Sequence, residues 1–174
     1  GVQILYGMFL ASWLRVSEDL ETCSMLPRRP QRSGQLGFLY LPPYRVQGIS
    51  YAGEQTAIHV PELDVSFDVG LCPKPVLAAP FIALTHGHMD HVAGLPYYFS
   101  QRMFQKMGVG TCVCHEAIAG DVQLMMSGWV DLEQQHTPHK IIPLEPMKSI
   151  EKKSIIIDIE TDLKSDLVWM IGIY

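Results

Sequence analysis

Four side chains that can bind a metal ion stand close together in residues 85–91, a run of sequence Thr-His-Gly-His-Met-Asp-His. A divalent ion needs several imidazole or carboxylate ligands that converge within about 2.0–2.2 Å. His86 and His88 are separated by one residue, so in an extended segment both point the same way and can bind one ion together. Asp90 and His91 are adjacent and diverge in an extended chain. A turn toward a helix at this point would bring both to a second ion beside the first.

The flanking sequence predicts a strand before these residues and a helix after them. Residues 81–84 form a short apolar run that leads directly into the histidines. Pro96 falls in the first turn of the predicted helix, where its missing N–H costs nothing. Apolar residues then recur every four positions up to Met107, and Gly108 is expected to end the helix. The end of a strand is where α/β proteins usually place their functional sites.

The pattern His86-x-His88-x-Asp90-His91 resembles the signature of the metallo-β-lactamase superfamily. The longer run of residues 85–96 is similar to the ribonuclease Z-like branch of that superfamily, which processes tRNA 3′ ends. Residues 67–70, Phe-Asp-Val-Gly, resemble the Asp-x-Gly element that precedes the motif. The resemblance covers about residues 45–150.

This resemblance implies a site for two Zn²⁺ ions and the chemistry of a metal-dependent hydrolase. His86 and His88 would hold the first ion and Asp90 and His91 the second, and Asp90 is the residue that the resemblance assigns to catalysis. Metal coordination can lower the pKa of water from about 15.7 to about 7, and the resulting hydroxide would attack the phosphorus of RNA or another phosphodiester. Asp68 would orient the histidine loop from behind the ligands. An ordinary turn at the end of a strand explains Asp68 equally well.

The family site also requires a further histidine for the first ion, a bridging aspartate and a later histidine, which the sequence does not show at the expected spacing. The histidines after the motif are His115, His136 and His139. His115 follows Cys112 and Cys114, a pattern that permits a Cys/His metal site. A buried strand followed by a helix cap is the favoured interpretation of this segment. His136 and His139 flank a Thr-Pro turn, and we expect a surface loop there.

The other patterns predict a layered α/β fold. Residues 46–51 and 56–60 are rich in strand-forming types and predict a hairpin. Residues 63–69 alternate apolar and polar types, as a half-buried strand does. Further strands are predicted at 110–114 and 141–144, with a helix between them at 118–132. The resemblance implies the αββα sandwich of metallo-β-lactamases, of which we expect only the N-terminal half.

Three regions are predicted along the 174 residues: a segment at 1–44 without recognisable chemistry, the metallo-β-lactamase-like unit at 45–150 and a β-hairpin tail at 151–174. The tail resembles the first carboxylate motif of DEDD-type exonucleases, which opens a ribonuclease H-like fold. Asp158 and Glu160 are two residues apart on a predicted strand and could bind Mg²⁺ together. A hairpin with two exposed acids is the simpler interpretation. Because the metallo-β-lactamase-like unit and the exonuclease-like tail resemble different families, a composite or truncated sequence is another possible explanation.

Composition restricts the partners of the chain. It is 48% hydrophobic and 18% charged, as globular proteins are, and its formal net charge of −5 gives no general attraction to phosphate. Arg28, Arg29 and Arg32 are interrupted by prolines and are expected to lie in a solvated loop. Four irregularly spaced cysteines fit a reducing, cytoplasmic compartment. The apolar stretch at 1–14 is shorter than the roughly 20 residues of a membrane span, so no membrane association is expected.

Three functions remain open on the sequence. The first is a zinc-dependent, ribonuclease Z-like hydrolase that acts on RNA or another phosphodiester. The second is a non-catalytic fragment with an incomplete metal site, and the third is a piece of a DEDD-type exonuclease. Half of a sandwich would expose an apolar sheet face. We therefore expect a homo-oligomer, or a partner chain that completes the sandwich.

Overall fold

The computed structural model describes residues 35–145, 148–152, 155–161 and 168–173. All of them fall in the larger of the chain's two compact units, residues 34–174. The predictions for the apolar stretch at 1–14 and for the arginine cluster lie outside the described residues. None of the helices in the described ranges is both long and apolar enough to cross a membrane.

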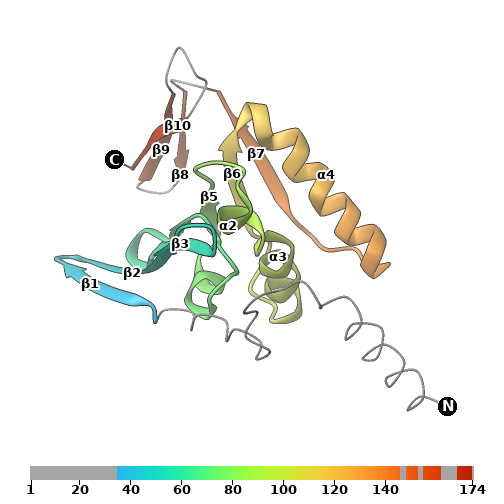
Figure 1. Ribbon diagram of the computed structural model, residues 1–174, viewed down its shortest axis with the longest axis horizontal. Helices are drawn as coiled ribbons and strands as arrows, with labels where there is room; N and C mark the ends of the chain where they lie inside the picture. Colours follow the sequence, from blue (N-terminus) through green and yellow to red (C-terminus); the bar gives the residue numbers. More distant parts are fainter. Residues whose placement is uncertain (1–34, 146–147, 153–154, 162–167, 174) are drawn as a thin grey trace, which may run out of the picture. The chain divides into compact units, whose positions relative to one another are not determined.

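A seven-stranded sheet, in which the strands follow one another in sequence order, forms the central layer (Figure 1). Its antiparallel part is made of β1 (Gly37–Leu41), β2 (Tyr44–Tyr51), β3 (Gln55–Val60) and β4 (Val65–Phe67). Its parallel part continues from β4 through β5 (Phe81–Ala83), β6 (Thr111–His115) and β7 (Lys140–Leu144). Parallel strands need crossover connections, and these segments contain the helices.

The crossovers hold three α-helices and a 3₁₀ turn, and a further 3₁₀ turn joins β3 to β4. In chain order these are η1 (Pro61–Leu63), η2 (Lys74–Ala78), α2 (Met89–Val92), α3 (Leu95–Phe104) and α4 (Glu116–Glu133). Helix α4 lies beside β6 and β7 (Figure 1). Tyr98 and Phe99 of α3 and Val122 and Met126 of α4 are buried in the core, so these helices cover one face of the parallel strands.

Both faces of the parallel strands β5 and β6 are buried, as is typical of parallel sheets. Ile82 and Cys112 belong to one core cluster, together with Tyr98 and Phe99 of α3. Phe81 and Val113, their neighbours in sequence, belong to a second cluster. This division follows the alternation of side chains along a strand. The sheet therefore fixes the ends of β4 and β5, and the residues that follow those ends form the candidate site.

The tail forms a separate three-stranded antiparallel sheet in the order β10-β9-β8. Its strands are β8 (Ser149–Lys152), β9 (Ile155–Thr161) and β10 (Val168–Ile173). The tail predicted as a β-hairpin thus contains an antiparallel pair of strands, β9 and β10. Asp158 and Glu160 lie two residues apart on β9, opposite Gly172 and Met170. A Mg²⁺ site at these two acids stays a prediction.

The fold class predicted from the sequence, mixed α/β, is confirmed, as is the hairpin now seen as β2 and β3. Two predicted boundaries are wrong. The strand predicted at 63–69 is shortened to β4 because Pro61 starts a 3₁₀ turn and Asp64 takes a left-handed φ of 57°. The helix expected to reach Gly108 ends at Phe104, and Lys106 then takes a φ of 56°. No sequence pattern predicted β1.

The contact between α3 and the loop after β4 can be tested at Gly94. A Cβ at Gly94 would lie 2.6 Å from the Cys72 amide nitrogen and 2.7 Å from the Gly70 carbonyl oxygen. We expect Gly94→Ala to lower the free energy of unfolding by roughly 1–3 kcal/mol because these backbone atoms must move. Gly128 in α4 has open space around it, so Gly128→Ala should raise stability by about 0.5–1 kcal/mol. Urea unfolding followed by circular dichroism measures both, and equal stabilities would contradict this packing.

Candidate metal centre

The histidine motif begins just after β5 and ends inside α2. Beyond Ala83 the chain stays extended, and the Leu84 N–H donates to the Val113 carbonyl of β6 at 2.9 Å. His88 is the N-cap of α2, and its carbonyl accepts from the amides of His91 and Val92 at 3.0 and 3.2 Å. The chain therefore turns into a helix at Met89. A turn of this kind was predicted to be necessary for Asp90 and His91 to reach the same metal ion.

The loop after β4 is bonded to the start of α2 and α3. The amides of Val69 and Gly70 both donate to the His91 carbonyl, at 3.0 and 3.1 Å. The Gly94 amide donates back to the Gly70 carbonyl at 2.7 Å. Gly70 has a φ of +50°, and a Cβ there would lie 3.0 Å from the Thr56 carbonyl oxygen. These bonds fix the position of Asp68 relative to the histidine motif.

Asp68 connects the strand ends to the histidines. Its side chain is almost fully buried, with 2% of its surface exposed. One carboxylate oxygen accepts from the Thr85 amide at 2.8 Å, and the other accepts from the Thr85 hydroxyl at 2.8 Å and from His91 Nδ1 at 2.7 Å. Bonds of this kind to a carboxylate are stronger than those between neutral groups. Asp68 thus holds two residues of the motif at once.

These bonds also decide which ring nitrogens carry protons. His91 donates its Nδ1–H to the carboxylate, so in the neutral ring Nε2 keeps a lone pair. The Thr85 hydroxyl gives its single proton to Asp68, so it accepts from His86 Nδ1, 2.9 Å away. The Nε2 of His86 therefore keeps a lone pair as well. A neutral imidazole with a free lone pair is the form that binds a metal ion.

His86 and His88 face each other with ligand-like spacing. The distance from His86 Nε2 to His88 Nδ1 is 3.0 Å, and the rings meet at an interplanar angle of 80°. Two nitrogens bound at about 2.0–2.1 Å to one tetrahedral zinc ion lie roughly 3.3 Å apart. The same spacing also suits a hydrogen bond from His88 to His86. Burial, reinforced by the neighbouring His91, lowers the pKa of His86 and favours its neutral, ligand form.

Asp90 and His91 make a second pair of ligand atoms. Asp90 Oδ2 lies 3.5 Å from His91 Nε2. Since the Nε2 of neutral His91 has no proton, neither atom can donate to the other, and a shared cation would relieve their repulsion. The Gly53 amide, in the turn between β2 and β3, donates to Asp90 Oδ2 at 2.9 Å and lowers the pKa of Asp90. The rings of His86 and His91 lie 4.0 Å apart, so the two pairs are neighbours.

Each pair supplies two ligands, whereas a catalytic zinc ion has three protein ligands and a water. Within the described ranges, no group of three or more His, Cys, Asp or Glu side chains could hold a metal ion. His115 caps α4 by accepting from the Ala117 amide at 3.0 Å, which confirms the predicted helix cap. His139 bonds to Gln123 and to the Thr137 carbonyl, and His136 is exposed. The donor set therefore fits half of each ion's coordination shell.

Two residues of the site were not singled out from the sequence. Thr85 stands next to His86, but its type alone gave no sign that its hydroxyl connects His86 to Asp68. Gly53 lies 37 positions before Asp90, and only a predicted turn marked it. Long-range contacts of this kind leave no trace in local spacing.

Comparison with known proteins first defines the class. No family model matches the chain. Among solved structures, the metallo-β-lactamase fold protein YhfI from Bacillus subtilis matches with a TM-score of 0.50 at 15% identity, over 72% of this chain and 53% of that chain. The chain therefore has the metallo-β-lactamase fold, and the match covers about half of that protein.

Three curated relatives are similar to this chain in sequence. A tRNase Z of Arabidopsis thaliana is 31% identical over 102 residues, which are 59% of this chain and 36% of the relative. A chloroplastic tRNase Z of the same plant is 31% identical over 67% of this chain and 33% of the relative. A nuclear ribonuclease Z of Triticum aestivum is 30% identical over 59% of this chain and 58% of the relative. The predicted resemblance to the ribonuclease Z-like branch is thereby confirmed, although the chain spans only one third to three fifths of these relatives.

The role of Asp68 can be tested by stability. Asp68→Ala leaves the Thr85 amide and the His91 Nδ1–H without their buried acceptor, so we expect a loss of roughly 2–4 kcal/mol in the free energy of unfolding. Asp68→Asn keeps the shape of the side chain and should lose less. Asp121→Ala, at an exposed position of α4, is the matched control and should change stability by no more than about 0.5 kcal/mol. Chemical denaturation of the three variants makes the comparison, and a neutral Asp68→Ala would refute the role given to Asp68.

Proposed function

We propose that this chain contributes to the metal centre of a zinc-dependent, ribonuclease Z-like hydrolase that cleaves phosphodiesters in RNA. His86 and His88 hold one Zn²⁺ ion, and Asp90 and His91 hold a second beside it. The observation that carries the proposal is the network around Asp68, which leaves the Nε2 lone pairs of His86 and His91 available to ligate. The resemblance to ribonuclease Z proteins supports the type of reaction.

In this proposal the protein's own residues bind and orient the ions. Asp68 holds the ring of His91 directly and that of His86 through Thr85, and the Gly53 amide holds Asp90. Such contacts behind the ligands commonly change metal affinity or activity by about 10–100-fold. When bound, the zinc ions supply a water acidified enough to act as a nucleophile at neutral pH. Asp90, as a ligand at the reacting centre, is the catalytic carboxylate of the proposal.

The remaining ligands come from residues outside the described ranges or from another chain. This follows from the absence, within the described part, of a third ligand for either pair. A partner chain that completes the sandwich, or a second copy of this chain, would supply such ligands. RNA as substrate rests on the names of the relatives, since the net charge of −5 does not favour phosphate. The relatives include nuclear and chloroplastic proteins, so a cytoplasmic location stays a prediction.

A second function is favoured by the same incomplete donor set. A chain that binds zinc through two-ligand pairs but lacks the remaining ligands would be a non-catalytic, weakly metal-binding protein. The absence of a group of three ligands among the described residues supports this alternative. The third hypothesis, a piece of a DEDD-type exonuclease at Asp158 and Glu160, gains no support from the described structure and stays a prediction.

Zinc content and hydrolysis separate these functions. We expect the full chain, dialysed against zinc and then buffer, to retain about two zinc ions by elemental analysis. It should also cleave a tRNA precursor with a 3′ extension. His88→Ala removes a ligand of the first ion, so it should reduce bound zinc and lower hydrolysis by at least about 100-fold. His136→Ala, in an exposed loop, is the matched control and should leave both unchanged.

Two outcomes would contradict the hydrolase. Retention of less than about one zinc ion per chain, without hydrolysis of the tRNA precursor, would favour the non-catalytic, weakly metal-binding alternative. No retained zinc, or zinc that His88→Ala does not reduce, would overturn the metal site itself.

A further inference from the structure

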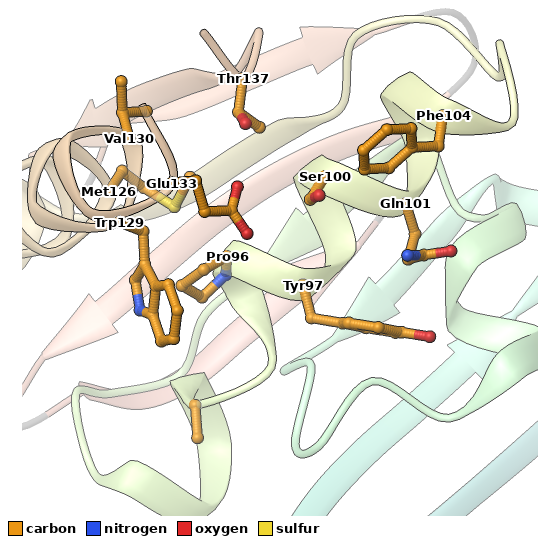
Figure 2. Close-up of a pocket in the computed structure, with 11 residues that line it drawn as sticks. Pro96, Tyr97, Ser100, Gln101, Phe104, Met126, Trp129, Val130, Glu133 and Thr137 are labelled. Atoms are coloured by element: carbon orange, nitrogen blue, oxygen red, sulfur yellow. The ribbon is translucent and has the colours of Figure 1, made fainter. Parts of the chain in front are cut away.

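A cavity of about 300 Å³ lies between α3 and α4, outside the candidate metal centre (Figure 2). Pro96, Tyr97 and Ser100 of α3 form one side of it, and Trp129 and Glu133 of α4 form the other. Thr137, in the loop that follows α4, closes one end. None of these residues has a role in the proposed hydrolase, so the inference below does not rest on that proposal.

One end of the cavity gathers oxygen atoms that can accept hydrogen bonds. Thr137 is 2% exposed, and its Oγ1 is buried without a hydrogen-bond partner in the described structure. Buried hydroxyls are usually paired, so an unpaired one that lines a cavity can bond to a group that enters the cavity. The Ser100 hydroxyl and the Glu133 carboxylate turn toward the same space from α3 and α4 (Figure 2). Among the ion pairs of the described residues, none involves Glu133.

The other walls of the cavity are aromatic. Tyr97, Phe104 and Trp129 all line it and are 53%, 61% and 44% exposed. Single exposed aromatic residues are common, but three around one cavity form a patch of the kind that binds another molecule. The faces of Trp and Tyr rings attract cations within about 6 Å. The walls therefore suit a flat or elongated group that carries positive charge.

The negative charge of α4 also favours a cation in the cavity. The helix carries four acidic residues and no lysine or arginine, its acids being Glu116, Asp121, Asp131 and Glu133. An anion entering the cavity would meet the Glu133 carboxylate and be repelled. A cation would be attracted, and it would find acceptors at Glu133 and at both hydroxyls. Phosphate and carboxylate groups are therefore poor occupants of this cavity.

We propose that the cavity between α3 and α4 binds an arginine side chain presented by a basic segment of a partner protein. A guanidinium group has five N–H donors and no acceptor, which matches the carboxylate of Glu133 and the hydroxyls of Ser100 and Thr137. It also stacks on aromatic faces such as those of Trp129 and Tyr97. The exposed ring of Phe104 extends the contact beyond the cavity, as an interface with a peptide requires.

Binding of a designed peptide to the full chain tests this proposal. The probe is a fluorescein-labelled eight-residue peptide with a single arginine between two leucines, and fluorescence anisotropy reports its binding. We expect saturable binding that weakens with added salt. Replacement of the arginine in the peptide by glutamine should weaken binding at least tenfold, because both the charge and most of the N–H donors are lost.

Variants of the chain locate the binding. Glu133→Gln should weaken peptide binding at least tenfold, and Thr137→Val should weaken it several-fold. Because the Thr137 hydroxyl bonds to no protein group among the described residues, Thr137→Val should not lower the melting temperature. Asp131→Asn, which removes an exposed acid of α4 outside the cavity, is the matched control and should change binding by less than twofold.

Three results would overturn the proposal. The first is the absence of saturable binding. The second is equal weakening by Asp131→Asn and Glu133→Gln, which would mean attraction by the general charge of α4. The third is a dimer or larger oligomer in size-exclusion chromatography that Trp129→Ala converts to a monomer. The occupant of the cavity would then be a second copy of this chain.

Discussion

The contact of the buried Asp68 carboxylate with Thr85 and His91 is the interaction on which the candidate site depends. It joins the end of β4 to the end of β5 and to α2. Through the Thr85 hydroxyl it also reaches His86, so one carboxylate sets the orientation and the protonated nitrogen of two rings. The rings of His86 and His91 are therefore held with Nδ1 toward this network, which leaves Nε2 of each neutral ring for a metal ion.

The rest of the fold keeps Asp68 in that position. Parallel pairing of β4, β5 and β6 brings the strand ends to one edge of the sheet, where Asp68 and Thr85 meet. The amides of Val69 and Gly70 bond to the His91 carbonyl, and Gly94 packs so closely on this loop that no Cβ fits. The proposed metal site and the proposed arginine-binding cavity are close in sequence. Ala93, which lines the cavity, follows the metal-site residue His91 by two positions.

Local spacing predicted much of this arrangement. The motif at 85–91, the strand before it and the helix after it were predicted because each depends on neighbours in sequence. The Gly53 contact with Asp90 could not be predicted, since it joins a hairpin turn to a helix across 37 positions. The early end of α3 depends on the left-handed conformation of Lys106. Lysine rarely adopts this conformation, so the sequence did not predict the end of the helix there. The cavity at Thr137 depends on how α3 and α4 pack, which periodicity does not describe.

The protonated nitrogen of each histidine ring tests the central claim most directly. Long-range ¹H–¹⁵N NMR of the metal-free chain, at a pH about one unit above the ordinary histidine pKa of roughly 6.5, distinguishes the two neutral tautomers. The network around Asp68 predicts that His91 and His86 both carry the proton on Nδ1 and leave Nε2 free. A proton on Nε2 of His91 would show that Asp68 does not accept from that ring, and it would contradict the account of how the ligand pairs are held.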